Sequence, residues 1–164
     1  ILLAETMGIR AAEVAIMARG ALLHDIGKIG VSDNILLKPA KLDEVEWRHM
    51  KQHPQMGYDI LSGIKFLKAP AEVVYAHHER YDGTGYPKGL RGSEIPLGAR
   101  IFSLVDTLDA MTSDRPYRRA LPFSAVLAEV ERCIGSQFDP SIAATFLSIP
   151  KDKWEKAGKR LFLD

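Results

Sequence analysis

The sequence between residues 11 and 30, AAEVAIMARGALLHDIGKIG, contains the features from which the fold can be predicted. Helix-favouring and apolar side chains fill positions 11–24, which predicts a helix over this range. Because apolar residues lie on most sides of that helix, we expect it to be central to the fold. Two glycines then break the pattern, and a polar loop follows. The predicted helix therefore ends on His24 and Asp25, two ionisable residues attached to an apolar segment.

The rest of the chain predicts further helices and no β-sheet. Asp43 and Glu46 have the spacing of a capping box at the start of one helix. Apolar positions between residues 101 and 111 recur at helical spacing. Asp139 resembles an N-cap residue, because a proline follows it. Since no stretch of useful length alternates between apolar and polar residues, we expect an all-α fold, a single helical bundle of about five to seven helices.

Composition excludes several classes of protein. The 164 residues include 22 Lys and Arg against 21 Asp and Glu, a formal net charge of +1. This balance argues against DNA or RNA as a partner, because coating a polyanion needs a basic surplus. No stretch approaches the roughly 20 apolar residues of a membrane span, so we expect no membrane contact from this segment. One cysteine, Cys133, cannot form an internal disulfide, which favours a reducing compartment such as the cytoplasm.

All five histidines lie in the first half of the chain, at His24, His49, His53, His77 and His78. A single buried histidine is more often a hydrogen-bonded core residue than a ligand, and we favour that interpretation for His49. A His-Asp pair ending an apolar helix needs a partner residue or a metal ion, since an unpaired buried charge costs several kcal/mol. Together with the adjacent pair His77-His78, it indicates a metal site.

The types of candidate ligand restrict the metal. Imidazole and carboxylate without thiolate suit Mn, Fe, Co or catalytic Zn. More than four candidate ligands are present, which favours a dinuclear centre about 3.5–4 Å across, with one bridging carboxylate and a hydroxide placed to attack phosphorus. Lys28 and the basic run at residues 115–119 supply cations suited to phosphate oxygens, although such a run by itself is more typical of a solvated loop.

Several motifs follow one another along the chain: HDIGK at residues 24–28, HHE at 77–79 and GYP at 85–87. Further matching segments are 38–39, 53–57, 106–110, 113–118 and 138–140. Over about residues 1–147 the combination resembles the HD-GYP family of the HD phosphohydrolase superfamily. The resemblance implies hydrolysis of cyclic di-GMP to pGpG, and often on to GMP, by a helical bundle that holds two or three divalent ions, iron or manganese.

The resemblance also implies which residues act. Asp25 would bridge two ions, and Lys28 would contact the scissile phosphate; these two are the catalytic residues that we expect. Asp109 would not bind a metal itself but would contact the residues that do. The full implied ligand set is His24, Asp25, His53, His77, His78 and Asp106.

The same resemblance assigns roles around the metals. Arg115 and Arg118 would bind phosphates of the ligand, together with Lys28. The loop formed by Gly85, Tyr86 and Pro87 would flank the site. In this family the loop is linked to contacts with other proteins.

The family carries a further metal-binding histidine, and sometimes a glutamate, on a helix that precedes the first residue here. The chain opens on Ile1 without an initiator methionine. We therefore expect an N-terminally truncated domain over residues 1–164, with a C-terminal tail over about 150–164 and one ligand missing from the first metal.

Two other functions remain open on the sequence. One is a non-catalytic module that binds a cyclic dinucleotide and signals; the other is an HD phosphohydrolase for a different nucleotide. As partners, the resemblance implies an N-terminal sensor or receiver domain and a diguanylate cyclase (GGDEF) protein. It leaves a homodimer open.

Overall fold

The computed structural model describes residues 1–114 and 119–159, and in this part of the chain the fold is all-α, as predicted. The only β-type pairing among these residues is an isolated bridge between Ile134 and Phe138. The described helices outnumber the predicted five to seven, because short segments form separate helices. They are α1 (Leu2–Thr6), α2 (Ala11–Leu23), α3 (Asp33–Leu36), α4 (Glu44–Met50), α5 (His53–Ser62), α6 (Lys68–Ala76), α7 (Leu97–Thr112), α8 (Phe123–Arg132), α9 (Pro140–Ser148) and α10 (Lys151–Lys159), with 3₁₀ segments η1 (Ile26–Gly30) and η2 (Gly92–Glu94).

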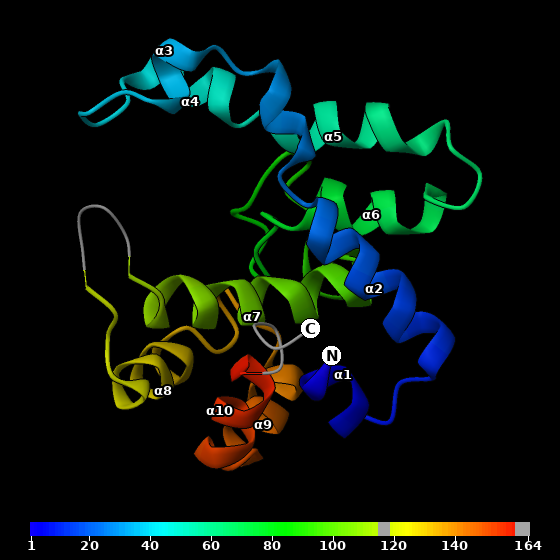
Figure 1. The fold of residues 1–164 in the computed structure, drawn as a ribbon, viewed down its shortest axis with the longest axis vertical. Coiled ribbons are helices and arrows are strands. Elements are labelled where there is room, and N and C mark those ends of the chain that lie inside the picture. Colours follow the sequence, from blue (N-terminus) through cyan, green and yellow to red (C-terminus); the bar gives the residue numbers. More distant parts are fainter. Residues whose placement is uncertain (115–118, 160–164) are drawn as a thin grey trace.

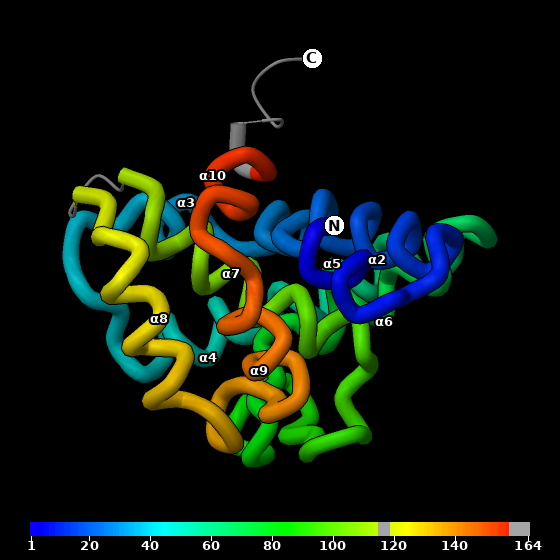
Figure 2. Tube along the Cα trace, turned by 90° about the horizontal axis from the view of Figure 1, so that it is seen from below, coloured from blue at the N-terminus to red at the C-terminus, as the bar shows by residue number. Residues whose placement is uncertain are grey.

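Helix α7 runs between two groups of helices. Figure 1 shows α2, α5 and α6 on one side of α7 and α8, α9 and α10 on the other. Figure 2, turned by 90°, keeps α8 apart from α2 and α6. The largest core cluster fills the second group and includes Leu104, Val126 and Phe146, all fully buried. Helix α10 lies in the segment expected to be a tail, and its Trp154 ring packs on Phe146, with 4.8 Å between centroids.

Helix α2 does not have the central place expected for it. Only Val14 and Gly20 are buried along its length, and the Leu22 side chain is 84% exposed. The helix packs with one side on α6 and α7, so apolar residues on its other side face outward. Gly20 explains the close packing, because a Cβ there would lie 2.6 Å from the Cβ of Val73. The apolar character of this segment was therefore misleading about its depth in the fold.

Local helix signals, by contrast, are confirmed. Asp43 accepts hydrogen bonds from the backbone N–H groups of Val45 and Glu46, and the Glu46 carboxylate accepts the Asp43 N–H in return, which completes the capping box. Asp139 caps α9 as predicted and also pairs with Arg100 of α7. None of the described helices combines the length and the apolar character that crossing a bilayer requires.

Two glycines bring η1 against the start of α5. A Cβ on Gly27 would lie 1.9 Å from the carbonyl oxygen of His53 and 2.5 Å from the backbone nitrogen of Gly57. A Cβ on Gly57 would lie 2.8 Å from Val74 of α6. Both sites are therefore closed to any side chain, because the atoms in the way are backbone atoms or a buried valine. This close approach places residues 24–28 beside His53.

Replacing Gly27 by alanine should separate η1 from α5. The clash is with backbone atoms that cannot rotate away, so we expect Gly27→Ala to lower the free energy of unfolding by about 2–3 kcal/mol. Gly63→Ala is the matched control, because its Cβ would meet nothing within 4 Å and its φ of −71° suits alanine. The control should change stability by less than about 1 kcal/mol. Urea unfolding measures both, and equal midpoints for the two variants would contradict the packing described here.

Candidate metal centre

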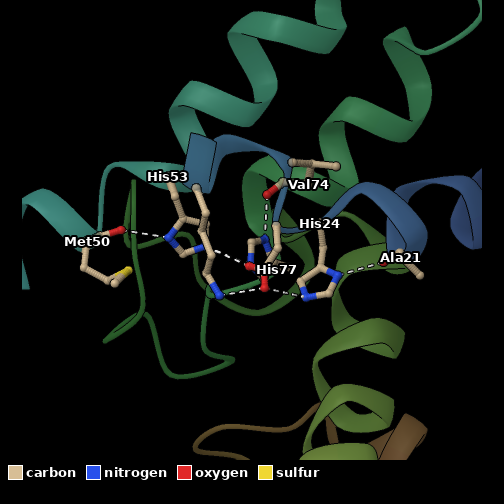
Figure 3. A network of polar contacts seen from close by, with 8 residues as sticks. Ala21, His24, Met50, His53, Val74 and His77 are labelled. Carbon is tan, nitrogen blue, oxygen red and sulfur yellow. Dashed lines mark hydrogen bonds and ion pairs between the residues drawn. The ribbon is translucent and has the colours of Figure 1, made fainter. Parts of the chain in front are cut away.

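Histidines from three parts of the chain converge at the packed ends of α2, α5 and α6 (Figure 3). His24 directly follows α2, His53 is the first residue of α5, and His77 and His78 directly follow α6. One ring nitrogen from each of His53, His77 and His78 lies within 4.8 Å of the other two. The rings are close as well, with 4.0 Å between the centroids of His77 and His78. This arrangement brings together imidazoles from three places in the sequence, of which the two nearest, His53 and His77, are 24 residues apart.

Each of three histidine rings is oriented by a hydrogen bond on its outer side. The Nδ1 atom of His24 donates to the carbonyl of Ala21, 2.7 Å away. In the same way His53 donates to Met50, at 2.7 Å, and His77 donates to Val74, at 2.6 Å. With the Nδ1 proton used in this bond, a neutral ring keeps a lone pair on Nε2. The Nε2 atoms of His53 and His77 therefore face the middle of the group with free lone pairs, whereas Nε2 of His24 faces the carboxylate of Asp25.

The inner nitrogens are arranged as ligands rather than as hydrogen-bond partners. The Nε2 atoms of His53 and His77 lie 3.4 Å apart, and both rings are buried. Since each Nδ1 already carries the proton of its neutral ring, neither Nε2 can donate to the other. A cation between two buried lone pairs that face each other would satisfy both. The donor set therefore fits a metal ion, and fits it better than a hydrogen-bonded core.

Burial keeps these imidazoles in the form that binds metals. It lowers the pKa of His77 to about 2 and, with the charge of His53 as a further cause, that of His78 to about 4. Burial also lowers the pKa of His53. At neutral pH the three rings are thus neutral, each with a single N–H, and no proton has to leave the other ring nitrogen before a cation binds.

Asp25 lies between His24 on one side of the site and His53 on the other. One carboxylate oxygen is 2.6 Å from Nζ of Lys28 and 3.3 Å from Nε2 of His24, and the other is 3.5 Å from Nε2 of His53. Burial raises the pKa of Asp25, but the hydrogen bonds from His24 and Lys28 outweigh it and hold the pKa well below its usual value. The carboxylate is therefore ionised, with one oxygen toward each histidine, as a bridging ligand requires.

Asp106 of α7 approaches the site from the His24 side. Burial lowers the pKa of His24, but its hydrogen bonds to Asp25 and Ala21 and the negative charges of Asp25 and Asp106 raise it above its usual value. Phe102, one helical turn before Asp106, places its ring 4.9 Å from the His24 ring. Helix α7 thus supplies both a carboxylate and an apolar wall.

The GYP loop covers His78. The Tyr86 ring stacks on the His78 ring at 4.7 Å, and the Tyr86 N–H donates to the His78 carbonyl. Gly85 permits this contact, because a Cβ would lie 2.3 Å from the backbone nitrogen of Arg80. Pro87 follows through a cis peptide bond. The loop predicted to flank the site therefore forms one of its walls.

The other predicted residues lie further out or outside the described part. Asp109 is exposed and accepts a hydrogen bond from the Ser113 hydroxyl at 3.3 Å. His49 is exposed, so the expectation of a buried core residue is wrong for it, and it is not one of the three histidines whose ligand nitrogens lie together. Arg115 and Arg118 lie outside the residues that the structure describes.

Sequence reasoning did not assign Glu79 or Lys51. Glu79 is only 3% exposed, and its carboxylate accepts the backbone N–H groups of Lys88 and Leu90, which ties the loop to the end of α6. Its place directly after the two histidines was the available signal. Lys51 lies over the Tyr86 ring, with Nζ 5.4 Å from the centroid. It stands two positions before His53 in the sequence, and this proximity was its only signal.

Comparison with known proteins gives the same picture. A family model described as an HD domain matches residues 2–142. The chain is 48% identical, over 85% of its length, to the cyclic di-GMP phosphodiesterase response regulator RpfG of Xanthomonas campestris, and 42% identical, over 92%, to a cyclic di-GMP phosphodiesterase of Thermotoga maritima. It is 45% identical, over 87%, to 3'3'-cGAMP-specific phosphodiesterase 3 of Vibrio cholerae. The chain spans 37%, 41% and 31% of these three relatives.

Solved structures share the fold at lower identity. A cyclic GMP-AMP specific phosphodiesterase of V. cholerae superposes with a TM-score of 0.64 and 18% identity, over 87% of this chain and 39% of that one. The protein Bd1817 of Bdellovibrio bacteriovorus gives 0.67 and 21%, over 88% and 46%. The fold, the order of the motifs and the match over residues 2–142 lead to one conclusion: the chain belongs to the HD domain family, in its HD-GYP group.

Proposed function

We propose that this chain is a metal-dependent phosphodiesterase that hydrolyses cyclic di-GMP to pGpG, GMP or both. The observation that carries the proposal is the pair of buried Nε2 atoms of His53 and His77, which face each other at 3.4 Å beside the ionised Asp25. The names of the relatives from Xanthomonas and Thermotoga supply the substrate. The chain covers less than half of each relative, so the activity is proposed for the protein that contains it.

The residues proposed to hold the metals fall into two sets around Asp25. His53, His77 and His78 would hold one ion, and His24 and Asp106 would hold the other, with Asp25 shared. Nitrogen and oxygen donors without thiolate suit iron or manganese. When bound, such ions polarise the phosphodiester and activate water for attack on phosphorus.

Lys28 has the chemistry to stabilise charge on the reacting phosphate. Its ammonium is held by Asp25 at 2.6 Å, and the Lys28 side chain is 39% exposed, so it lies at the edge of the site where a substrate can reach it. A fixed cation beside the phosphoryl oxygens gains strength as negative charge develops there. Arg115 and Arg118 are proposed as further phosphate contacts, and Asp109 as an outer support for Asp106.

The second candidate keeps the reaction and changes the nucleotide. The 45% identical relative from V. cholerae is named as specific for 3'3'-cGAMP, which also contains two phosphodiester groups. Comparing the kcat/KM of cyclic di-GMP with that of 3'3'-cGAMP decides between them, because our proposal requires the former to be higher. A non-catalytic module is less favoured, since the residues of the candidate centre are present and assembled.

Two observations bear on the cellular context. A free, buried cysteine fits the bacterial cytoplasm. The Xanthomonas relative is named a response regulator, so we propose that a receiver or sensor domain accompanies this one. Interaction with a diguanylate cyclase and formation of a homodimer stay predictions from the family resemblance.

Asp25→Ala should remove both metal and activity. The carboxylate is the group that both ion positions would share, so its loss leaves each of them with one ligand fewer. Elemental analysis of anaerobically purified protein and chromatography of the products measure the two effects. His49→Ala is the matched control and should keep the metal content and rate of the unmodified protein. Full activity in Asp25→Ala would rule out the proposed centre.

Lys28→Ala should lower kcat for cyclic di-GMP by about 10²-fold or more, as expected when a group that stabilises transition-state charge is lost. Metal content should stay within error of the unmodified protein, because Lys28 is not a ligand. Steady-state kinetics and elemental analysis on the same preparation test this. An unchanged kcat would remove Lys28 from the mechanism, and a loss of metal would make it a structural residue.

A further inference from the structure

Lys51 is a cation that aromatic rings, rather than a carboxylate, hold in place. It caps the C-terminal end of α4, two residues before His53. Its Nζ lies 5.4 Å from the centroid of the Tyr86 ring and 6.0 Å from that of Trp47. Within the described residues it forms no ion pair, whereas Lys28 and Lys38 pair with Asp25 and Glu46. Its charge is therefore available to an anion.

This cation lies one aromatic ring away from the candidate metal centre. The Tyr86 ring stacks on His78 at 4.7 Å, and Nζ of Lys51 lies over the same tyrosine ring, 5.4 Å from its centroid. An anion bound at Lys51 would thus occupy the wall of the site beyond His78. Lys28 approaches the centre from η1, through Asp25. The two lysines offer positive charge at two separate places.

The wall that carries Lys51 is built rigidly. The buried Glu79 carboxylate accepts two backbone N–H groups from the far end of the loop, at Lys88 and Leu90. The Tyr86 N–H is bonded to the His78 carbonyl. The Tyr86 ring is therefore fixed before any ligand arrives, and a preorganised contact costs less ordering on binding.

A cyclic dinucleotide needs positive charge at two places. It contains two phosphodiester groups, each with one negative charge, and only one of them can occupy the reacting position at a time. The other must lie against a second part of the protein. A nucleobase beside it needs an aromatic face, because bases bind proteins largely by stacking on such rings. Trp47, 47% exposed and next to Lys51, offers that face.

We propose that Lys51 binds the phosphate that is not being cleaved, and that Trp47 stacks on the adjoining base. This inference rests on the proposed function and extends it to a second subsite. It makes Lys51 a determinant of affinity for a dinucleotide, with no part in the chemistry at the reacting phosphorus. It also predicts that a substrate with a single phosphodiester gains nothing from Lys51.

The test compares two substrates. Lys51→Gln should raise the KM for cyclic di-GMP by about tenfold or more, the effect of losing one charge-assisted contact, with kcat and metal content within about twofold. For bis(p-nitrophenyl) phosphate, which has one phosphodiester, kcat/KM should be unchanged. Lys51→Arg should restore the KM for cyclic di-GMP. Lys65→Gln removes a charge from the exposed segment between α5 and α6 and should change neither substrate.

Two results would overturn the subsite. One is an unchanged KM for cyclic di-GMP in Lys51→Gln, and the other is an equal loss on both substrates, which would place Lys51 at the reacting phosphate or in the fold. Calorimetric titration of the unmodified protein and of Lys51→Gln with cyclic di-GMP separates this proposal from the enzymatic one. If the unmodified protein binds cyclic di-GMP without hydrolysing it, the enzymatic proposal is rejected. A tenfold weaker affinity in Lys51→Gln would still support the subsite, whereas an equal affinity would reject the subsite.

Discussion

Three of the histidines at the candidate centre hydrogen-bond to carbonyl groups at the ends of helices, where the helix itself supplies no donor. Ala21 and Val74 lie in the last turns of α2 and α6, and Met50 is the last residue of α4. The Nδ1 proton of each ring satisfies one such carbonyl, and this single bond fixes both the tautomer and the direction of Nε2. The site therefore depends on where helices end, and the glycine contact between η1 and α5 determines how near those ends can come.

This dependence explains which parts of the molecule the sequence could predict. Signals that act within a few residues were reliable, such as the capping box at Asp43 and the N-cap at Asp139. The candidate ligands were predicted from short motifs, and the structure brings His53, His77 and His78 together. The depth of α2 could not be predicted, because an apolar segment does not indicate how much of its surface its neighbours cover. The exposed Leu22 is the clearest example.

The wall of the site was also hidden from sequence reasoning, and for a related reason. Lys51 meets Tyr86 only because the junction of α4 and α5 packs beside a loop more than thirty residues later. Glu79 follows the two histidines in a motif, and nothing in the sequence indicates that its buried carboxylate accepts hydrogen bonds from the backbone of that loop. Contacts of this kind depend on the tertiary arrangement, and neither spacing nor periodicity encodes them.

Together these features support one proposal, that the buried neutral imidazoles of His53, His77 and His78 and the shared carboxylate of Asp25 belong to a centre for two metal ions. Anomalous diffraction from crystals grown after anaerobic purification, with data at the iron and manganese edges, tests it most directly. We predict two peaks, one among His53, His77 and His78 and one between His24 and Asp106, with Asp25 touching both. Crystals of fully loaded protein without a peak at the three histidines, or with Asp25 away from both peaks, would contradict the claim.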